Sequence, residues 1–142
     1  MDKTEEKLCE VQGRLFAASR EAGYESEPFI KAFMRSCMAK GLDENYNHLQ
    51  WAGEEYLLEE LQGEAALAEG DNIFEEEVLY WMGYAYRYWH FMTGESSKII
   101  LRMAPVPAMR RKYKKFHGLD LSPMVEKMRE SYLKKHPPKS KK

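Results

Sequence analysis

The stretch 73–93, IFEEEVLYWMGYAYRYWHFMT, decides the fold of this chain. From Val78 onward it is apolar or aromatic on nearly every side of a helix, and Gly94 follows it as a stop signal. A helix that is hydrophobic all round belongs at the centre of a bundle. Aromatic residues also favour strands, but the length without a turn signal argues against a strand. The sequence therefore predicts a central aromatic helix over about residues 72–93.

The segments on both sides of this helix carry apolar residues at helical spacing, and Gly, Pro and Ser residues separate them. The expected helices cover 4–22, 26–41, Asp43 to about Leu61, 97–104, 107–117 and a last segment that begins at Ser122. The predicted fold is an all-α single domain, a bundle of six or seven helices over residues 1–135. Residues 136–142 are Pro- and Lys-rich and are expected to form a mobile tail.

Length and composition exclude several classes of protein. The chain has 142 residues, of which 44% are hydrophobic and 32% charged, and this fits one globular domain rather than a disordered or fibrous chain. No apolar run approaches the ~20 residues of a membrane-spanning helix, and the acidic N-terminus resembles no secretory signal. Cys9 and Cys37 are distant in sequence and fit reduced thiols. These features predict a cytoplasmic protein.

The net charge of −1 conceals a strong asymmetry along the chain. Residues 1–80 carry 7 basic and 19 acidic side chains, a net charge of −12, and residues 81–142 carry 15 basic and 4 acidic ones, a net charge of +11. The acidic segment 41–80 contains no Lys or Arg. Such a split indicates either a surface for a charged partner or attraction between the two halves of the fold.

Arg87 lies in the middle of the aromatic stretch and His90 follows it one turn later. A guanidinium there is either paired with an acid, for which the segment Glu54–Glu60 is the expected source, or it contacts an anion with help from His90. The ion pair is the favoured interpretation. The aromatic residues are likewise favoured as core, with a partner-binding patch as the alternative. The candidate partner or anion contacts are Arg87, His90, Tyr86, Trp89, Glu54 and Glu55.

The sequence contains no pattern typical of a catalytic or metal site. It has no His-Glu-x-x-His motif, no phosphate-binding loop, no G-x-G-x-x-G and no G-x-S-x-G nucleophile motif. An enzymatic site would need Arg87, His90 and a carboxylate to converge in a pocket. We therefore expect a protein that is not an enzyme and that uses no metal and no cofactor.

The segment 96–117, SSKIILRMAPVPAMRRKYKKFH, resembles a helix-turn-helix with a basic second helix. Five cations on that helix could contact nucleic-acid phosphates, or they could lie against the acidic segment 41–80. The helix offers no Asn, Gln, Ser or Thr for reading base edges. The candidate nucleic-acid contacts are Arg110, Arg111, Lys112, Lys114 and Lys115.

Two blocks, residues 29–61 and 77–120, resemble a family of uncharacterised small bacterial proteins common in gut Firmicutes and their relatives. The most specific motifs are LQWAGEEY at 49–56, YWMG at 80–83, YRYWH at 86–90 and TGESSK at 93–98. The resemblance implies short operons whose other product is similar to an ADP-ribosyltransferase-type toxin, and hence an antitoxin-like role. The basic run at 110–115 is heavier here than in the family's pattern.

Sequence and resemblance together predict a non-catalytic protein-binding module that neutralises a toxin enzyme encoded nearby. The docking surface would be the acidic segment 41–80 or the exposed edge of the aromatic helix. The alternative is a helix-turn-helix nucleic-acid-binding regulator that uses residues 96–117. Neither hypothesis involves a membrane, and the sequence assigns no oligomeric state.

Overall fold

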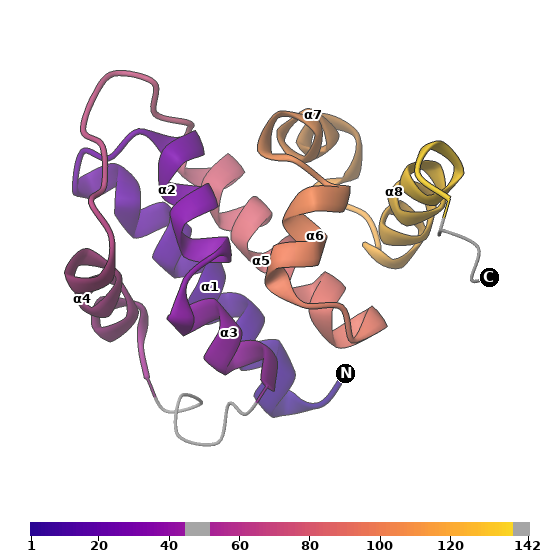
Figure 1. Cartoon of the computed structure of the whole chain (residues 1–142), viewed down its shortest axis with the longest axis horizontal. Coiled ribbons are helices and arrows are strands. Elements are labelled where there is room, and N and C mark those ends of the chain that lie inside the picture. The colour runs from indigo at the N-terminus through magenta and orange to yellow at the C-terminus, as the bar shows by residue number, and fades with distance from the viewer. Residues whose placement is uncertain (45–51, 138–142) are drawn as a thin grey trace.

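The computed structural model describes residues 1–44 and 52–137, and this part of the chain is an all-α domain of eight helices (Figure 1). The helices are α1 Lys3–Glu21, α2 Ser26–Met34, α3 Cys37–Glu44, α4 Glu54–Glu64, α5 Glu76–Thr93, α6 Ser97–Met103, α7 Val106–Phe116 and α8 Ser122–Lys135. The predicted all-α bundle is confirmed. The number of helices exceeds the predicted six or seven, because the segment predicted as one helix over 26–41 forms two.

Ser36 causes this division. Its hydroxyl donates a hydrogen bond to the Phe33 carbonyl at 2.7 Å, and its oxygen accepts one from the Ala39 amide at 3.2 Å. A serine in this position satisfies early amide groups and starts a new helix. The prediction that the helix ends at Gly41 is wrong, since α3 continues to Glu44. Part of the helix predicted from Asp43 to Leu61 falls on residues 45–51, outside the described residues.

The boundaries of the later helices follow local signals. Gly94 closes α5 with a φ of +80°, a left-handed conformation that favours glycine, and the Ser96 side chain accepts a hydrogen bond from the Ile99 amide at the start of α6. The start of α5 is later than predicted. Its N-cap residue is Glu75, three residues beyond Asn72, and no side-chain hydrogen bond caps it.

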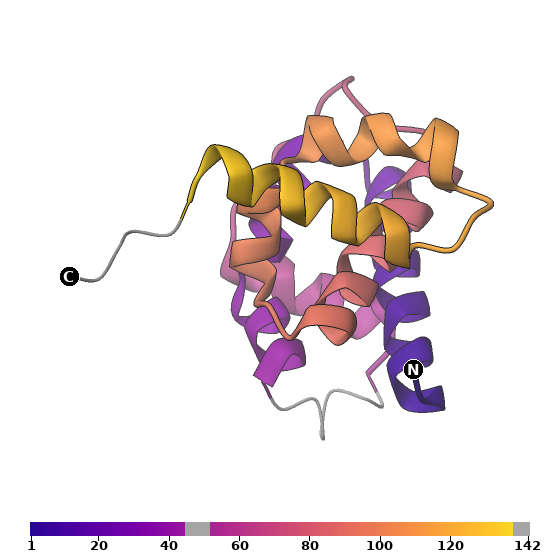
Figure 2. The ribbon, with the colours of Figure 1, turned by 90° about the vertical axis from the view of Figure 1, so that its right-hand side faces the viewer.

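The aromatic helix α5 lies at the centre of the bundle, as predicted, and α1 packs along it (Figures 1 and 2). The two helices approach most closely at Gly13 and Gly83. A Cβ atom on Gly83 would overlap the backbone of Gln12, and one on Gly13 would lie 2.9 Å from the Tyr80 carbonyl oxygen. Two glycines therefore permit the backbone contact that joins the N-terminal helix to the core.

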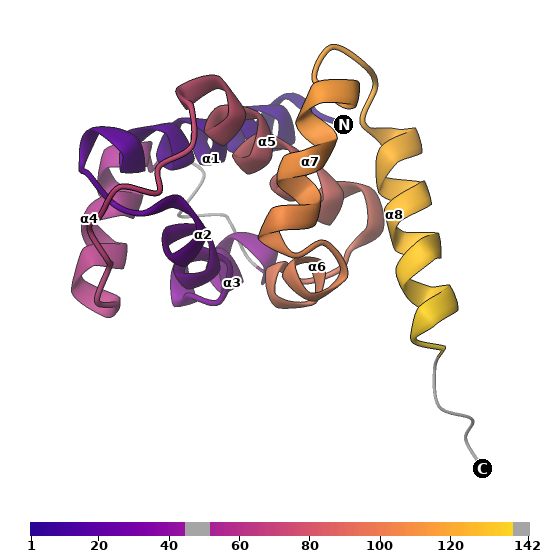
Figure 3. The same cartoon turned by 90° about the horizontal axis from the view of Figure 1, so that it is seen from above.

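The remaining helices place opposite charges at opposite ends of the molecule. In Figures 1 and 3, α4 lies at one end and α8 at the other, with α7 beside α8. The helix α4 carries five glutamates and no Lys or Arg, while α7 carries five Lys or Arg and no acid. The charge asymmetry of the sequence thus becomes an asymmetry in space.

Candidate functional site

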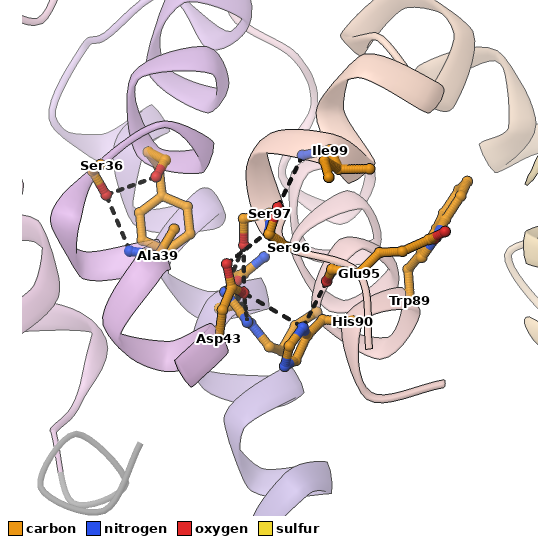
Figure 4. Close-up of polar contacts among 12 residues, drawn as sticks. Ser36, Ala39, Asp43, Trp89, His90, Glu95, Ser96, Ser97 and Ile99 are labelled. Carbon is orange, nitrogen blue, oxygen red and sulfur yellow. Dashed lines mark hydrogen bonds and ion pairs between the residues drawn. The ribbon is translucent and has the colours of Figure 1, made fainter. Parts of the chain in front are cut away.

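Arg87 is the centre of a buried polar network that joins four helices. Its side chain is fully buried, and its Nη1 atom donates to Asp43 Oδ1 at 2.6 Å. Its Nε atom donates to Gln12 Oε1 at 2.8 Å, and its Nη2 atom donates to Ser97 Oγ at 3.2 Å. Ser97 also donates its amide to Asp43 Oδ2 at 2.7 Å. Figure 4 shows the carboxylate of Asp43 facing Ser97 and His90.

The favoured ion-pair interpretation of Arg87 is therefore confirmed, but its predicted partner is wrong. The acid is Asp43 on α3, and Glu54, from the segment that was expected to supply it, instead pairs with Arg14 on α1 at 3.2 Å. Burial lowers the pKa of the Arg87 guanidinium, and the carboxylate of Asp43 opposes this effect. With its donors occupied inside the fold, the guanidinium has no surface to offer a partner or an anion.

His90 lies beside this network and is 8% exposed. Its Nδ1 atom is 2.7 Å from the Glu95 carbonyl oxygen and 3.6 Å from Asp43 Oδ1. Because a carbonyl oxygen accepts hydrogen bonds, Nδ1 carries the proton and acts as the donor. Arg87, His90 and a carboxylate thus converge, as an enzymatic site would require. The complete burial of Arg87 in an ion pair counts against that use.

The aromatic side chains of α5 that were candidates for partner contact lie in the core. Trp89 is fully buried, and its Nε1 atom donates to Glu95 Oε1 at 2.8 Å. Tyr86 is 1% exposed, and its hydroxyl donates to the Ala104 carbonyl at 2.6 Å. Burial raises the pKa of the Tyr86 hydroxyl. The core interpretation of these two residues is confirmed, and only half-buried residues such as Tyr84 remain at the edge of the helix.

Glu95 connects this core to α8 and gives it a pH dependence. Its Oε2 atom accepts from Arg129 Nε at 2.6 Å, in addition to the bond from Trp89. Burial raises the pKa of this carboxyl, but the hydrogen bonds from Trp89 and Arg129 outweigh burial and hold it below its ordinary value of 4.5. The ionised form therefore stabilises the fold above pH 4.5, and this contribution is lost as the pH falls through the folded-state pKa.

We expect the Glu95→Gln variant to lose less stability than the wild type between pH 5 and about pH 3, because its side chain has no proton to gain. Urea unfolding followed by tryptophan fluorescence at each pH measures this difference. Parallel loss of stability in the two proteins across this range would contradict the assignment.

The acidic candidates Glu54 and Glu55 lie on a separate face. Glu55 is exposed, whereas Glu54 is half-buried beside Arg14. A groove of about 470 Å³ opens here between α1, α4 and the start of α5. We call it the acidic groove; its lining residues are Arg14, Ala17, Ala18, Glu21, Glu54, Glu76, Glu77 and Tyr80. Its four glutamates face one arginine, so the groove complements a basic surface.

The five basic candidates of α7 do not pair with the acidic segment 41–80. In the described part of the chain, no ion pair joins α7 to a carboxylate. One of these cations, Arg110, contacts that segment through its guanidinium, which lies 3.9 Å from the ring centroid of Phe74. Arg110, Arg111, Lys114 and Lys115 are exposed and Lys112 is half-buried. The predicted packing of the basic helix against these acids therefore finds no direct ion pair among the described residues.

A second groove, of about 790 Å³, lies between α7 and α8. We call it the α7–α8 groove; its Lys and Arg lining residues are Arg102, Arg111, Lys112, Lys115, Lys127 and Lys135, and His136 also lines it. No acid lines it. Of the five predicted cations, three face this groove, whereas Arg110 and Lys114 are absent from its lining.

Sequence reasoning missed several residues that these sites use. Asp43, Gln12 and Ser97 complete the network around Arg87, and Lys127 and Lys135 complete the α7–α8 groove. The sequence did indicate a role for Gln12, because this polar residue interrupts the apolar stripe of its helix next to Val11 and one turn after Leu8. A polar residue there requires a buried partner. Asp43, Ser97, Lys127 and Lys135 lie far in sequence from the residues that they meet, and no local sequence pattern predicted their roles.

The residues described offer no site for a metal ion and no helix that could cross a membrane. No group of three or more His, Cys, Asp or Glu side chains gathers among them, and none of their helices is both long and apolar enough to span a bilayer. Cys9 and Cys37 are free thiols, and burial raises the pKa of Cys9 to about 12. Comparisons of the chain with protein-family models, with curated proteins and with solved structures found no match.

Proposed function

We propose that this protein is a non-catalytic protein-binding module that docks on a basic partner protein through its acidic face. The observation that supports this proposal is the acidic groove, in which four glutamates surround a small apolar floor of Ala17 and Ala18. The exposed acids of α4 extend the face beyond the groove, and Tyr56 among them is 46% exposed. Tyrosine is one of the residue types enriched among the residues that dominate binding energy in protein interfaces.

The partner that we propose is a toxin enzyme encoded nearby, which the protein neutralises in the manner of an antitoxin. An enzyme that handles nucleotides or nucleic acid presents a basic cleft to its substrate, and an acidic face of this kind complements such a cleft. The interior position of Arg87, Tyr86 and Trp89 moves the proposed interface from the aromatic helix to α1, α4 and the start of α5.

Two matched variants test this proposal. Glu55→Gln/Glu59→Gln removes two exposed charges one turn apart on α4, and Glu126→Gln/Glu130→Gln removes an equivalent exposed pair on α8. We expect the α4 variant to bind the partner about tenfold more weakly, because exposed ion pairs contribute roughly 0.2–1 kcal/mol each. The α8 variant should bind normally. The measurement is co-expression with the neighbouring gene, pull-down, titration of the purified pair and rescue of growth.

The proposal fails if the wild type neither forms a complex with the neighbouring gene product nor rescues growth. It also fails as a statement about the acidic face if both variants weaken binding equally, since that result would reflect only the net charge of the protein.

A second candidate function is nucleic-acid binding by the basic helix α7. The observation that favours it is the absence of carboxylate partners for the five cations of α7 within the described residues. Helices α6 and α7 are separated only by Ala104 and Pro105, which fits the helix-turn-helix hypothesis. The two functions use opposite ends of the molecule and are compatible.

A further inference from the structure

The α7–α8 groove gathers cations from three helices rather than from a single recognition helix. Arg102 comes from α6, three cations come from α7, and Lys127 and Lys135 come from α8, with His136 directly after it. Within residues 1–44 and 52–137, none of the six Lys and Arg side chains has a carboxylate within 4.0 Å. No direct ion pair therefore offsets their mutual repulsion, which favours binding of a polyanion.

The floor of the groove is apolar and carries an aromatic pair at one end. Met103, Ala108 and Met128 contribute to it, and Tyr132 stacks on His136 with ring centroids 4.3 Å apart. Nucleic-acid bases stack on aromatic side chains of this kind without regard to sequence, while cations along the groove contact the phosphates. The lining of the groove therefore fits a nucleic-acid strand whose bases are unpaired and accessible.

The position of α8 favours a single strand over a duplex. A recognition helix enters the major groove of DNA with its base-reading face free. Here the face of α7 that carries Arg111, Lys112 and Lys115 shares its groove with α8, which runs beside it (Figure 3). Of the Asn, Gln, Ser and Thr side chains that read base edges, only Ser131 lines the groove.

We propose that the α7–α8 groove binds single-stranded nucleic acid without sequence preference, through phosphate contacts from α6, α7 and α8 and stacking on Tyr132 and His136. This inference rests on the second candidate function, nucleic-acid binding, and changes both its site and its substrate. It adds Arg102, Lys127 and Lys135 to the residues that bind.

Adjacent lysines provide a matched pair of variants. Lys115 and Lys135 line the groove, whereas Lys114 and Lys134 are their exposed neighbours on the same helices, and Lys134 lines a different groove with Glu126 and Glu130. Lys115→Ala/Lys135→Ala and Lys114→Ala/Lys134→Ala therefore remove the same charge from the same helices. Circular dichroism of both full-length variants checks that they fold alike.

The experiment measures the fluorescence anisotropy of a labelled 15-nucleotide oligothymidylate at several salt concentrations. Each phosphate contact to a single strand contributes about 0.7 to the slope of log K against log salt, or about fivefold in affinity at 0.1 M salt. We expect the groove variant to bind about 25-fold more weakly, with a slope smaller by about 1.4, and the control variant to bind like the wild type.

Three other outcomes would overturn the proposal. Equal weakening in both variants would show binding to diffuse charge rather than to the groove. Preferred binding of a 15-base-pair duplex that Arg110→Ala weakens and Lys135→Ala does not would return the function to α7 as a recognition helix. If neither the oligothymidylate nor the duplex binds, the hypothesis of nucleic-acid binding fails as a whole. Binding of poly-glutamate in the same assay would then identify an acidic protein as the occupant of the groove.

Discussion

The Asp43→Ala variant is expected to lose about 3–5 kcal/mol of unfolding free energy, because it leaves the Arg87 guanidinium buried without a counter-charge. The bond between Arg87 Nη1 and Asp43 Oδ1 is 2.6 Å long, and the arginine side chain is fully buried. The amide of Ser97 loses its acceptor at the same time. Urea unfolding followed by circular dichroism measures the change.

The surface pair Lys40–Glu44 provides the control for this experiment. Its atoms are 3.6 Å apart, and both side chains are well exposed, so Glu44→Ala should cost no more than about 0.5 kcal/mol. A second comparison isolates the buried charge. Adding Arg87→Met to Asp43→Ala should recover part of the lost stability, because no unpaired charge then remains. If the double variant is less stable than Asp43→Ala, the unpaired guanidinium is not the cause of the loss.

The second large effect is expected at Gly83. The Gly83→Ala variant should lose about 3 kcal/mol of unfolding free energy, because the new Cβ atom would overlap the backbone of Gln12 and the Cα atom of Gly13. Backbone atoms cannot rotate away as a flexible side chain can, so α1 and α5 must move apart. This separation would also lengthen the bond from Gln12 Nε2 to the Gly83 carbonyl, now 3.1 Å.

Gly63 in α4 is the matched control. A Cβ atom there would meet nothing within 4 Å, so Gly63→Ala should raise the unfolding free energy by about 0.5–1 kcal/mol through better helix propensity. The opposite signs of the two Gly→Ala changes are the test, and thermal unfolding of both variants measures them. Stabilisation by Gly83→Ala would contradict the close contact of α1 with α5.

The sequence predicted most helix boundaries where the signal is local. Gly94 and Ser96 mark the end of α5 and the start of α6 because their effects act within one turn of the chain. The prediction failed where two local signals competed. Ser36 divides the segment 26–41, although the apolar stripe continues across it. The start of α5 was predicted too early, at about residue 72, because Asp71 and Asn72 are residue types that often cap a helix, whereas the helix begins at Glu76.

The candidate site could likewise be predicted only where a local sequence pattern indicates it. Arg87 was expected to form an ion pair because a charge within an apolar helix requires one, but the choice of Asp43 over Glu54 depends on how α3 packs against α5. Sequence periodicity fixes which face of a helix is apolar and does not fix which helix lies opposite. Partners separated by 44 positions therefore had to be read from the tertiary structure.

The sequence alone determined an all-α domain with an aromatic central helix and a charge split of −12 and +11, because composition and helical periodicity are properties of the chain itself. Only the tertiary structure separated the charges into an acidic groove and a basic one at opposite ends. It also assigned Lys115 and Lys135 to one groove and excluded Lys114 and Lys134 from it. Adjacent residues on a helix point about 100° apart, so the packing of α7 beside α8 selects which of them meet.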